Sequence, residues 1–439
     1  MINSFPGYEF KKLEDNKFHN IYRGVDVGFG GYVYAEPGVY YDVALLDVGN
    51  MHGASIIALN KFGEYTKNYK EIRDARMAIK EGLKTGDFSK ANNYLGGRLS
   101  KYLTSPEVAD SLQNALKLIL NSTYGIADAT FDNPLHDKRD VNNIIALRGA
   151  LFMKTLQDEV VKKGYKVCHI KTDSIKVANA DEEIIDFILN FGKEYGYEFE
   201  HECTYSKICL VNDAVYVAKY DNLGIRNKGG KHFNEWTATG TQFQVPYVFK
   251  TLFSHEPIEF NDMCETKSVS TALYLDMNET LPNVAAAEKD LDKYEDMLEL
   301  GKISQDEFDK VSYMLKEEIA QGHDYHFIGK VGQFCPILPG FGGGLLRREK
   351  DGKYYAVTGT KKKDGTLYRW LESEMVRTLE KEDYIDESYY QNLCNEAVKA
   401  IDKAGEPFGI TYDMFVDDNY IPLPSSVTKV ATDEEIPFA

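Results

Sequence analysis

The segment HIKTDSIKV, residues 169–177, constrains the fold more than any other stretch of the chain. Two short apolar runs flank Thr-Asp-Ser, which predicts a strand, a tight turn and a second strand with Asp173 at the tip. An Asp at a turn usually caps a backbone N–H, so a plain hairpin turn is one interpretation. The other is a metal-binding acid, which would need a partner acid elsewhere in the chain.

A second acid at a predicted strand end lies in YYDVALLDVGNMHGASIIALN, residues 40–60. The apolar run from Val43 to Leu46 leads to Asp47, and a Gly-Asn pair then turns the chain. A structural acid at the end of a buried parallel strand would also explain Asp47. Two converging carboxylates, however, suit Mg²⁺, which prefers oxygen ligands. Two such ions, about 3.5–4 Å apart, can clamp the attacking and leaving oxygens of a phosphoryl transfer.

A helical pattern in YKEIRDARMAIKEGLKTG, residues 69–86, places four cations on one face. At 100° per residue they fall within about an 80° arc that contains no acid. The four are Arg73, Arg76, Lys80 and Lys84. Because like charges at i,i+4 are mildly destabilising, this stripe is either a solvated face or the partner of a polyanion.

A second helix is predicted over residues 105–128, with Ser105 and Pro106 at its start and Gly125 at its end. Polar side chains form one row along it, and apolar side chains cover much of the opposite side. The row consists of Gln113, Lys117, Asn121 and Tyr124. We expect the two helices to form an antiparallel hairpin that presents phosphate donors and an aromatic ring to one bound nucleotide.

Several of these segments resemble the motifs of family B DNA-directed DNA polymerases, in a version similar to those of bacteriophages. The strongest match is KLILNSTYG, residues 117–125, which fits the family pattern K-x-x-x-N-S-x-Y-G in full. The other matches are LDVGNMHGASII (46–57) to D-x-x-S-L-Y-P-S-I-I with substitutions, IKTDSIKV (170–177) to D-T-D-S, RMAIK (76–80) to R-x-x-x-K, and GFGGYV (28–33) to Y-x-G-G. Motif order and rough spacing agree over residues 20–250, and the remainder resembles a thumb more loosely.

The resemblance implies a role for each matching position. The catalytic, metal-binding acids would be Asp47 and Asp173, with the backbone carbonyl of Val48 as a further ligand and two Mg²⁺ ions, or Mn²⁺, as the cofactor. The residues that would hold the incoming dNTP are Arg76, Lys80 and Lys117 at the triphosphate, His52 at the family's sugar-gating position, and Met51, Asn121 and Tyr124. The residues that would contact primer-template DNA are Gly30, Gly31, Tyr216, Lys219 and Thr239.

The resemblance also implies an α+β fold with the polymerase right-hand architecture. An antiparallel-sheet palm would comprise residues 1–58 and 126–245, and a helical-hairpin fingers domain residues 59–125. A mixed thumb would occupy residues 246–439. Within that thumb, residues 285–322 have the pattern of two charged amphipathic helices joined near Gly301.

Charge and composition narrow the choice of partners. The net charge of −18 argues against a protein that coats itself with nucleic acid, but not against one with a single cationic cleft. No apolar run is long enough to span a membrane and the N-terminus does not resemble a secretory signal, so we expect a cytoplasmic chain without membrane contact, in the host cytoplasm if it is viral. Six scattered cysteines without a C-x-x-C pair favour reduced core residues over zinc ligands or disulfides.

The chain also departs from the family pattern. Lys171 replaces the first acid of D-T-D-S, Asn50 replaces the serine of the first motif and Gly53 its proline. Only 46 residues precede Asp47, so we expect no proofreading exonuclease here and regard a separate exonuclease chain as a candidate partner. The short segment between Asp47 and Lys117 favours a nucleic-acid primer over a terminal-protein primer.

Other functions are compatible with part of this pattern. The main alternative is a non-catalytic DNA-binding relative or accessory subunit, suggested by Lys171, Gly53 and the missing exonuclease. A reverse transcriptase or RNA polymerase shares a two-metal palm, but NSTYG fits family B and not those classes. A kinase-like enzyme is disfavoured because neither G-x-x-x-x-G-K-[ST] nor a kinase loop occurs.

Overall fold

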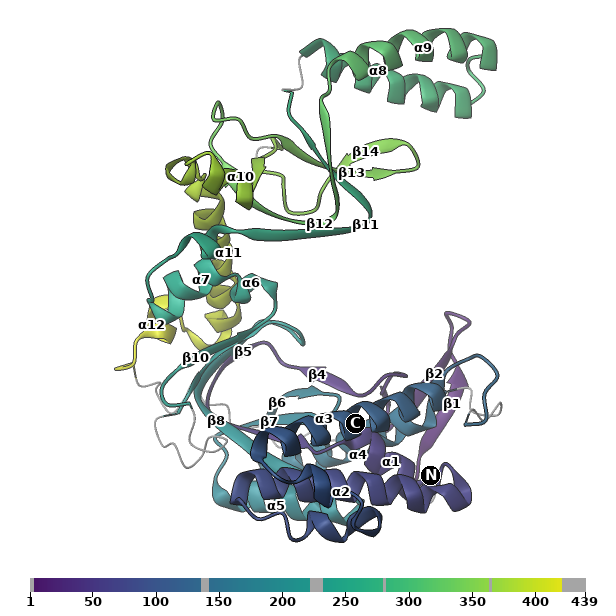
Figure 1. The fold of residues 1–439 in the computed structure, drawn as a ribbon, viewed down its shortest axis with the longest axis vertical. Helices are drawn as coiled ribbons and strands as arrows, with labels where there is room; N and C mark the ends of the chain where they lie inside the picture. Colours follow the sequence, from purple (N-terminus) through teal and green to yellow (C-terminus); the bar gives the residue numbers. More distant parts are fainter. Residues whose placement is uncertain (1–3, 136–141, 222–231, 279–281, 363–364, 421–439) are drawn as a thin grey trace, which may run out of the picture. The chain divides into compact units, whose positions relative to one another are not determined.

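The computed structural model describes residues 4–135, 142–221, 232–278, 282–362 and 365–420 (Figure 1). The chain divides into two compact units, residues 1–240 with 400–439, and residues 241–399. This division differs from the predicted thumb, 246–439, at both ends. At the C-terminal end the reason is aromatic packing within the first unit, where Phe408 lies 5.8 Å from Tyr40 and Phe415 lies 5.5 Å from Trp236 between ring centroids.

The first unit is built on a seven-stranded sheet with the order β10-β9-β8-β5-β7-β6-β4 (Figure 1). Every neighbouring pair in it is antiparallel, so the sheet is antiparallel as predicted and β5 is not the buried parallel strand of the alternative interpretation. Its strands are β4 (Val33–Ala35), β5 (Gly38–Val48), β6 (Lys166–Lys171), β7 (Ser174–Ala178), β8 (Phe199–Leu210), β9 (Tyr216–Tyr220) and β10 (Trp236–Thr239).

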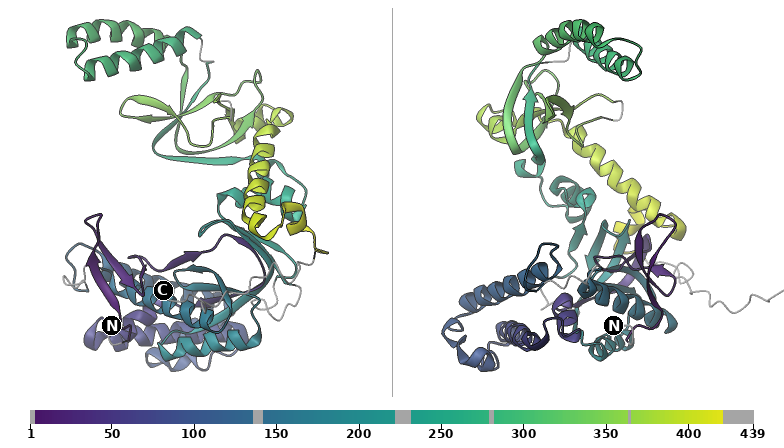
Figure 2. Two further views of the ribbon diagram at one scale, coloured as in Figure 1. Left: turned by 180° about the vertical axis from the view of Figure 1, so that it is seen from behind. Right: turned by 90° about the vertical axis from the view of Figure 1, so that its right-hand side faces the viewer.

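Two helices cover one face of this sheet, α4 (Ile144–Lys162) and α5 (Glu182–Glu194) (Figure 2). Their apolar side chains share a core with Leu46 and Val48 of β5. Because side chains alternate along a strand, the intervening Asp47 lies on the opposite face. The central strand therefore supplies core packing on one face and an acid on the other.

A separate three-stranded sheet precedes β4. Its strands are β1 (Tyr8–Lys12), β2 (Phe18–Tyr22) and β3 (Val25–Asp26). After β5 the chain turns into the short helix α1 (Met51–Ala58), which begins at Asn50, a left-handed residue whose side chain accepts a hydrogen bond from the N–H of Gly53. The predicted turn after Asp47 thus leads into a helix.

The predicted helical pair is present as α2 (Thr66–Thr85) and α3 (Pro106–Asp128). Tyr69, near the start of α2, shares an apolar cluster with Leu120, near the end of α3. Further along α2, Ile79 shares a cluster with Ala109, near the start of α3. The two helices therefore run antiparallel, as predicted.

The caps of these helices follow local rules, with one exception. The side chain of Ser105 accepts a hydrogen bond from the N–H of Val108, and Gly86 ends α2 in the left-handed conformation at φ 79°. The prediction that Gly125 ends α3 was wrong, because the helix continues to Asp128. The extra turn is held by Ala127, which is 2% exposed within an apolar cluster.

The second unit contains a five-stranded sheet with the order β14-β13-β11-β12-β15. Its strands are β11 (Glu265–Asp276), β12 (Tyr325–Ile337), β13 (Leu345–Lys350), β14 (Lys353–Ala356) and β15 (Arg369–Glu372). The predicted charged helices are α8 (Pro282–Glu299) and α9 (Gln305–Gln321), and Gly301 lies between them with φ 65°. The remaining helices are α6 (Thr241–Gln244), α7 (Pro246–Phe249), α10 (Ser373–Thr378), α11 (Glu387–Gly405), which contains the unit boundary, and α12 (Tyr412–Val416) in the first unit.

Mixed helices and antiparallel sheets confirm the predicted α+β class. Within the described ranges, no helix combines the length and the apolar character needed to cross a membrane.

Candidate active site

Asp173 lies at the two-residue turn between β6 and β7, where the sequence predicts it. Thr172 adopts the left-handed conformation with φ 56°, and its N–H donates to the carbonyl of Tyr32 at 3.0 Å. The turn also packs against Gly31, where an added Cβ would lie 2.9 Å from Thr172 Cγ2. The φ angle of Gly31 is +136°, which L side chains rarely adopt. Only glycine fits this position without strain, so the GFGGYV segment supports the turn that carries Asp173.

Asp47 lies at the end of β5, beside that turn. In the sheet it is paired with Ser174 of β7 on one side and with Glu200 of β8 on the other. The N–H of the next residue, Val48, donates to the carbonyl of Asp173 at 2.9 Å. Adjacent strands therefore bring the two predicted acids to the same edge of the sheet.

A cavity of about 360 Å³ collects most of the predicted site residues. The site residues predicted from the sequence that line this cavity are Asp47, Val48, Met51, His52, Arg76, Lys80, Lys117, Asn121 and Asp173. Its further lining residues are Gly49, Asn50, Leu120, Glu200 and Glu202. Strand ends, the start of α1 and the facing surfaces of α2 and α3 thus converge on one space.

Tyr124, the remaining predicted nucleotide residue, joins this site through His52. The two rings are stacked, with centroids 4.2 Å apart and planes inclined by 8°. The Tyr124 hydroxyl accepts a hydrogen bond from Asn143 Nδ2 at 3.1 Å. Burial lowers the pKa of His52, opposed by the charges of Asp173 and Asp128. His52 and Tyr124 together form a flat aromatic wall.

The cationic stripe of α2 faces the acids of β8. Lys80 Nζ lies 3.9 Å and Lys84 Nζ 3.7 Å from Glu200 Oε1. Arg76 is half-buried, and its Nε is shielded from water without a hydrogen-bond partner among the described residues. Burial lowers the pKa of Arg76, and Glu200 acts in the opposite direction. The stripe is thus not a fully solvated face.

Glu200 and Glu202 are site residues that the motif comparison missed. The stretch EFEHE, residues 198–202, alternates acids with other residues and directly starts a strand. Because Glu200 is opposite Asp47 in the sheet, the two carboxylates lie on the same face. The alternation itself was the available signal, although the strand register was needed to place it.

The oxygen donors at this edge fit a hard divalent cation. Burial raises the pKa of Asp173, and Glu202 acts in the same direction, against a backbone N–H and His52. A nearby cation would hold such a carboxyl in its charged form. Within the part of the chain that the structure describes, no group of three or more His, Cys, Asp and Glu side chains could hold a metal ion. Two carboxylates, completed by the Val48 carbonyl, water and substrate oxygens, nevertheless match the usual ligands of Mg²⁺.

Three of the five predicted DNA contacts lie on β9 and β10, and they divide into two groups. Tyr216 and Thr239 line a separate cavity, of about 340 Å³, together with Asp173 and Lys171. Lys219 is instead 5% exposed, and its Nζ bonds Asp418 Oδ2 at 2.6 Å. The charge of Lys219 is thus buried and paired with Asp418 in the structure, and its phosphate contact stays a prediction.

No protein-family model matches the chain, and no curated protein matches it. Among solved structures, the chain is similar to the structure of the family B DNA polymerase from the hyperthermophilic archaeon Pyrobaculum calidifontis. The sequence identity is 13% and the TM-score is 0.41, over 85% of this chain and 46% of that one. The chain therefore spans less than half the length of that polymerase.

Proposed function

We propose that the chain is a template-directed DNA polymerase that adds dNTPs to a primer 3′-hydroxyl by two-metal phosphoryl transfer. The observation that carries the proposal is the cavity that joins the acids Asp47 and Asp173 to Arg76, Lys80 and Lys117. Polymerisation needs both features in one place, since acids bind the metal ions and cations bind the triphosphate. The motifs support family B for this proposed activity, because they resemble the family's bacteriophage-type version.

In the proposed reaction the strand-end residues hold the metal ions. Asp47, Asp173 and the Val48 carbonyl supply the protein ligands, and bound Mg²⁺ would activate the 3′-hydroxyl and stabilise the leaving pyrophosphate. Arg76, on α2, and Lys117, on α3, approach the triphosphate from two helices. Positioning and electrostatic stabilisation, without a covalent intermediate, would supply most of the rate.

The wall formed by His52 and Tyr124 suits the sugar and base of the incoming nucleotide. Both rings are half-buried and stacked on each other, so their positions are fixed before a nucleotide binds. A nucleotide sugar packed against His52 leaves little space for a 2′-hydroxyl, which would favour dNTPs over rNTPs. Asn121 adds an amide at the same cavity.

A non-catalytic DNA-binding relative is the second candidate function. The observation that favours it is Lys171, an exposed cation that lines the 340 Å³ cavity beside Asp173. An ammonium group at this position could contact a phosphate of bound DNA without chemistry. This candidate predicts DNA binding that is independent of Asp47 and Asp173.

Primer extension separates the two candidates. A labelled primer-template duplex is incubated with the full chain, dNTPs and Mg²⁺, with and without EDTA. We expect extension that EDTA abolishes and that Asp47→Asn or Asp173→Asn lowers roughly a thousandfold or more. The matched control is Asp42→Asn, since Asp42 is exposed on the same strand with φ 46°, a conformation that Asn tolerates.

The possible outcomes of this assay distinguish the polymerase from the non-catalytic relative. Extension by the parent chain and by Asp42→Asn, but not by the two site variants, supports the polymerase. DNA binding without extension in any variant supports the non-catalytic relative. Full activity of either site variant contradicts the assignment of the metal-binding acids. The same assay with a mismatched primer end tests the expected absence of proofreading, and rNTPs test the sugar preference.

A further inference from the structure

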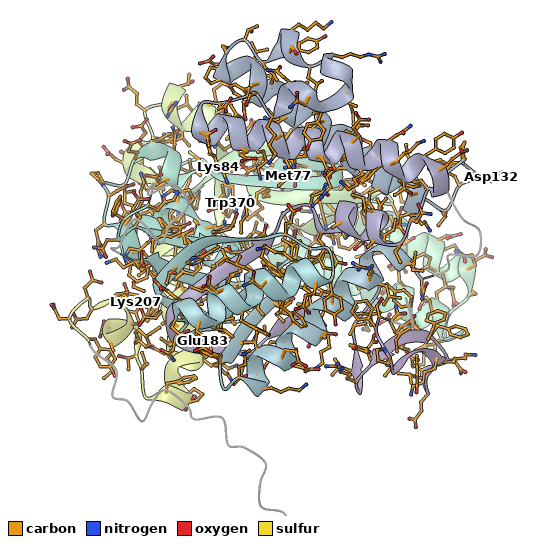
Figure 3. All side chains as sticks on the ribbon, turned by 90° about the horizontal axis from the view of Figure 1, so that it is seen from below. Met77, Lys84, Asp132, Glu183, Lys207 and Trp370 are labelled. Atoms are coloured by element: carbon orange, nitrogen blue, oxygen red, sulfur yellow. The ribbon has the colours of Figure 1, made fainter. Side chains whose placement is uncertain are left out.

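A second cavity of about 360 Å³ lies along the outer part of the α2 stripe. It shares Lys80 and Glu200 with the candidate nucleotide cavity, so the two spaces adjoin. Met77 and Lys84, both labelled in Figure 3, also line it. The sequence motifs give this space no role, although its size is within the range of sites that hold small ligands.

Arg73 is the unusual residue of this cavity. It is 6% exposed, and its Nε and Nη2 are shielded from water without a hydrogen-bond partner among the described residues. Its Nη1 donates a long hydrogen bond to Asp74 Oδ1 at 3.5 Å, and its Nη2 lies 3.8 Å from Glu198 Oε2. A buried guanidinium with incompletely satisfied donors is costly unless an anion completes its bonding.

The other charges around the cavity are unevenly paired. Lys90 and Glu81 form a close pair at 2.7 Å, and Asp74 is bound by Lys70. Arg73 Nη2 lies 3.8 Å from Glu198 Oε2, and Lys84 Nζ lies 3.7 Å from Glu200 Oε1. These contacts are longer than charge-assisted hydrogen bonds, which are about 2.7–2.9 Å. The Glu198 side chain is 58% exposed, so it can turn into solvent when another anion arrives.

We propose that this second cavity binds inorganic pyrophosphate, with Arg73, Lys80 and Lys84 as its donors. The proposal rests on the proposed polymerase function, because pyrophosphate is the product of that reaction. The shared Lys80 allows the product to pass from the nucleotide cavity to the second one, one helical turn along the stripe. His52, on which Tyr124 stacks, lines the first cavity and not the second, which is why a free polyphosphate fits the second better than a dNTP does.

The test measures pyrophosphate itself. Equilibrium dialysis of the full chain with radiolabelled pyrophosphate and Mg²⁺, without DNA, gives the Kd, and product inhibition of primer extension gives the inhibition constant. We expect Arg73→Gln and Lys84→Gln each to raise both constants about tenfold, while the KM for dNTP changes less. Arg73→Lys should retain part of the affinity. Lys67→Gln is the matched control, because Lys67 is exposed on α2 and does not line the cavity.

Several results would overturn the inference. One is unchanged pyrophosphate affinity in Lys84→Gln, which is decisive even if Arg73→Gln fails to fold, since Lys84 is an exposed side chain. Another is a parallel shift of the dNTP KM and the pyrophosphate constants, which would assign both residues to the nucleotide cavity. If the chain binds pyrophosphate through these residues but does not extend a primer, the pyrophosphate site is supported and the polymerase function is rejected. If the chain extends a primer but the variants bind pyrophosphate as the parent does, the polymerase function is supported and the pyrophosphate site is rejected.

Discussion

A buried ion cluster in the second unit predicts that this unit loses stability as pH rises. His323 Nδ1 lies 2.5 Å from Asp276 Oδ2, and its Nε2 lies 3.2 Å from Glu288 Oε1. The side chains of His323 and Asp276 are 2% and 0% exposed. Since Asp276 ends β11 and Glu288 belongs to α8, the protonated imidazole joins the sheet to the charged helical pair.

The size of the effect follows from the pKa of His323. Hydrogen bonds to Asp276, the larger effect, and to Glu288 raise the pKa of His323 to about 9, from an ordinary value of about 6.5. A group whose pKa is higher in the folded state stabilises fully below its unfolded pKa and loses that contribution as pH rises through its folded pKa. The difference corresponds to roughly 3 kcal/mol, lost between about pH 6.5 and 9.

Hydrogen exchange measured by mass spectrometry on the full chain can follow this unit separately. We expect peptides from β11 and α8 to lose protection between pH 6.5 and 9.5, after correction for the intrinsic exchange rate. His323→Gln should lower protection at pH 6.5 and remove most of the pH dependence, because Gln carries no titrating charge. His326→Gln is the matched control, since His326 is 58% exposed on β12. Equal protection at both pH values in the parent chain would refute the reasoning.

Three further predictions concern the first unit. Lys117→Gln should raise the KM for dNTP about tenfold or more in primer extension, because it removes a charged contact to the triphosphate. Lys219→Gln should lower the free energy of unfolding by about 1 kcal/mol in urea denaturation, since Asp418 is 55% exposed and can be rehydrated. The same variant should leave the salt dependence of DNA affinity unchanged, whereas loss of a phosphate contact would reduce that slope by about 1. Lys171→Asp should raise the pKa of Asp173 through like-charge repulsion and shift the acidic limb of the pH profile of extension upward.

Local sequence determines the parts of the site that could be predicted. The turn that carries Asp173 needs two apolar strands and a two-residue connection, and these lie within ten residues. The left-handed conformation of Thr172 does not follow from its type, because β-branched residues rarely adopt it. Helix α2 is specified by its period and by Gly86 at its end. The end of α3 was mispredicted because the packing of Ala127, a tertiary effect, outweighs the preference of Gly125 for a helix terminus.

The missed residues depend on contacts that are distant in sequence. Glu200 lies opposite Asp47 only through the pairing of β5 with β8, which includes a register shift between Leu45 and Leu46. A slip of one residue would turn Glu200 to the other face of the sheet. The burial of Lys219 likewise depends on Asp418, 199 residues further along the chain. The alternation of side chains along a strand predicts neither the pairing of Glu200 with Asp47 nor the ion pair of Lys219 with Asp418.

Glu198, just before β8, and Glu200, on β8, also explain how four like charges persist on α2. Repulsion along the stripe is offset when Lys80 and Lys84 share the carboxylate of Glu200 and Arg73 approaches Glu198. The Lys84 ammonium, at 3.7 Å from Glu200 Oε1, keeps donors that a phosphate can accept. These two acids therefore compete with a polyphosphate ligand for the cations of α2. The affinity of the stripe for such a ligand depends on how easily Glu198 and Glu200 move away from those cations.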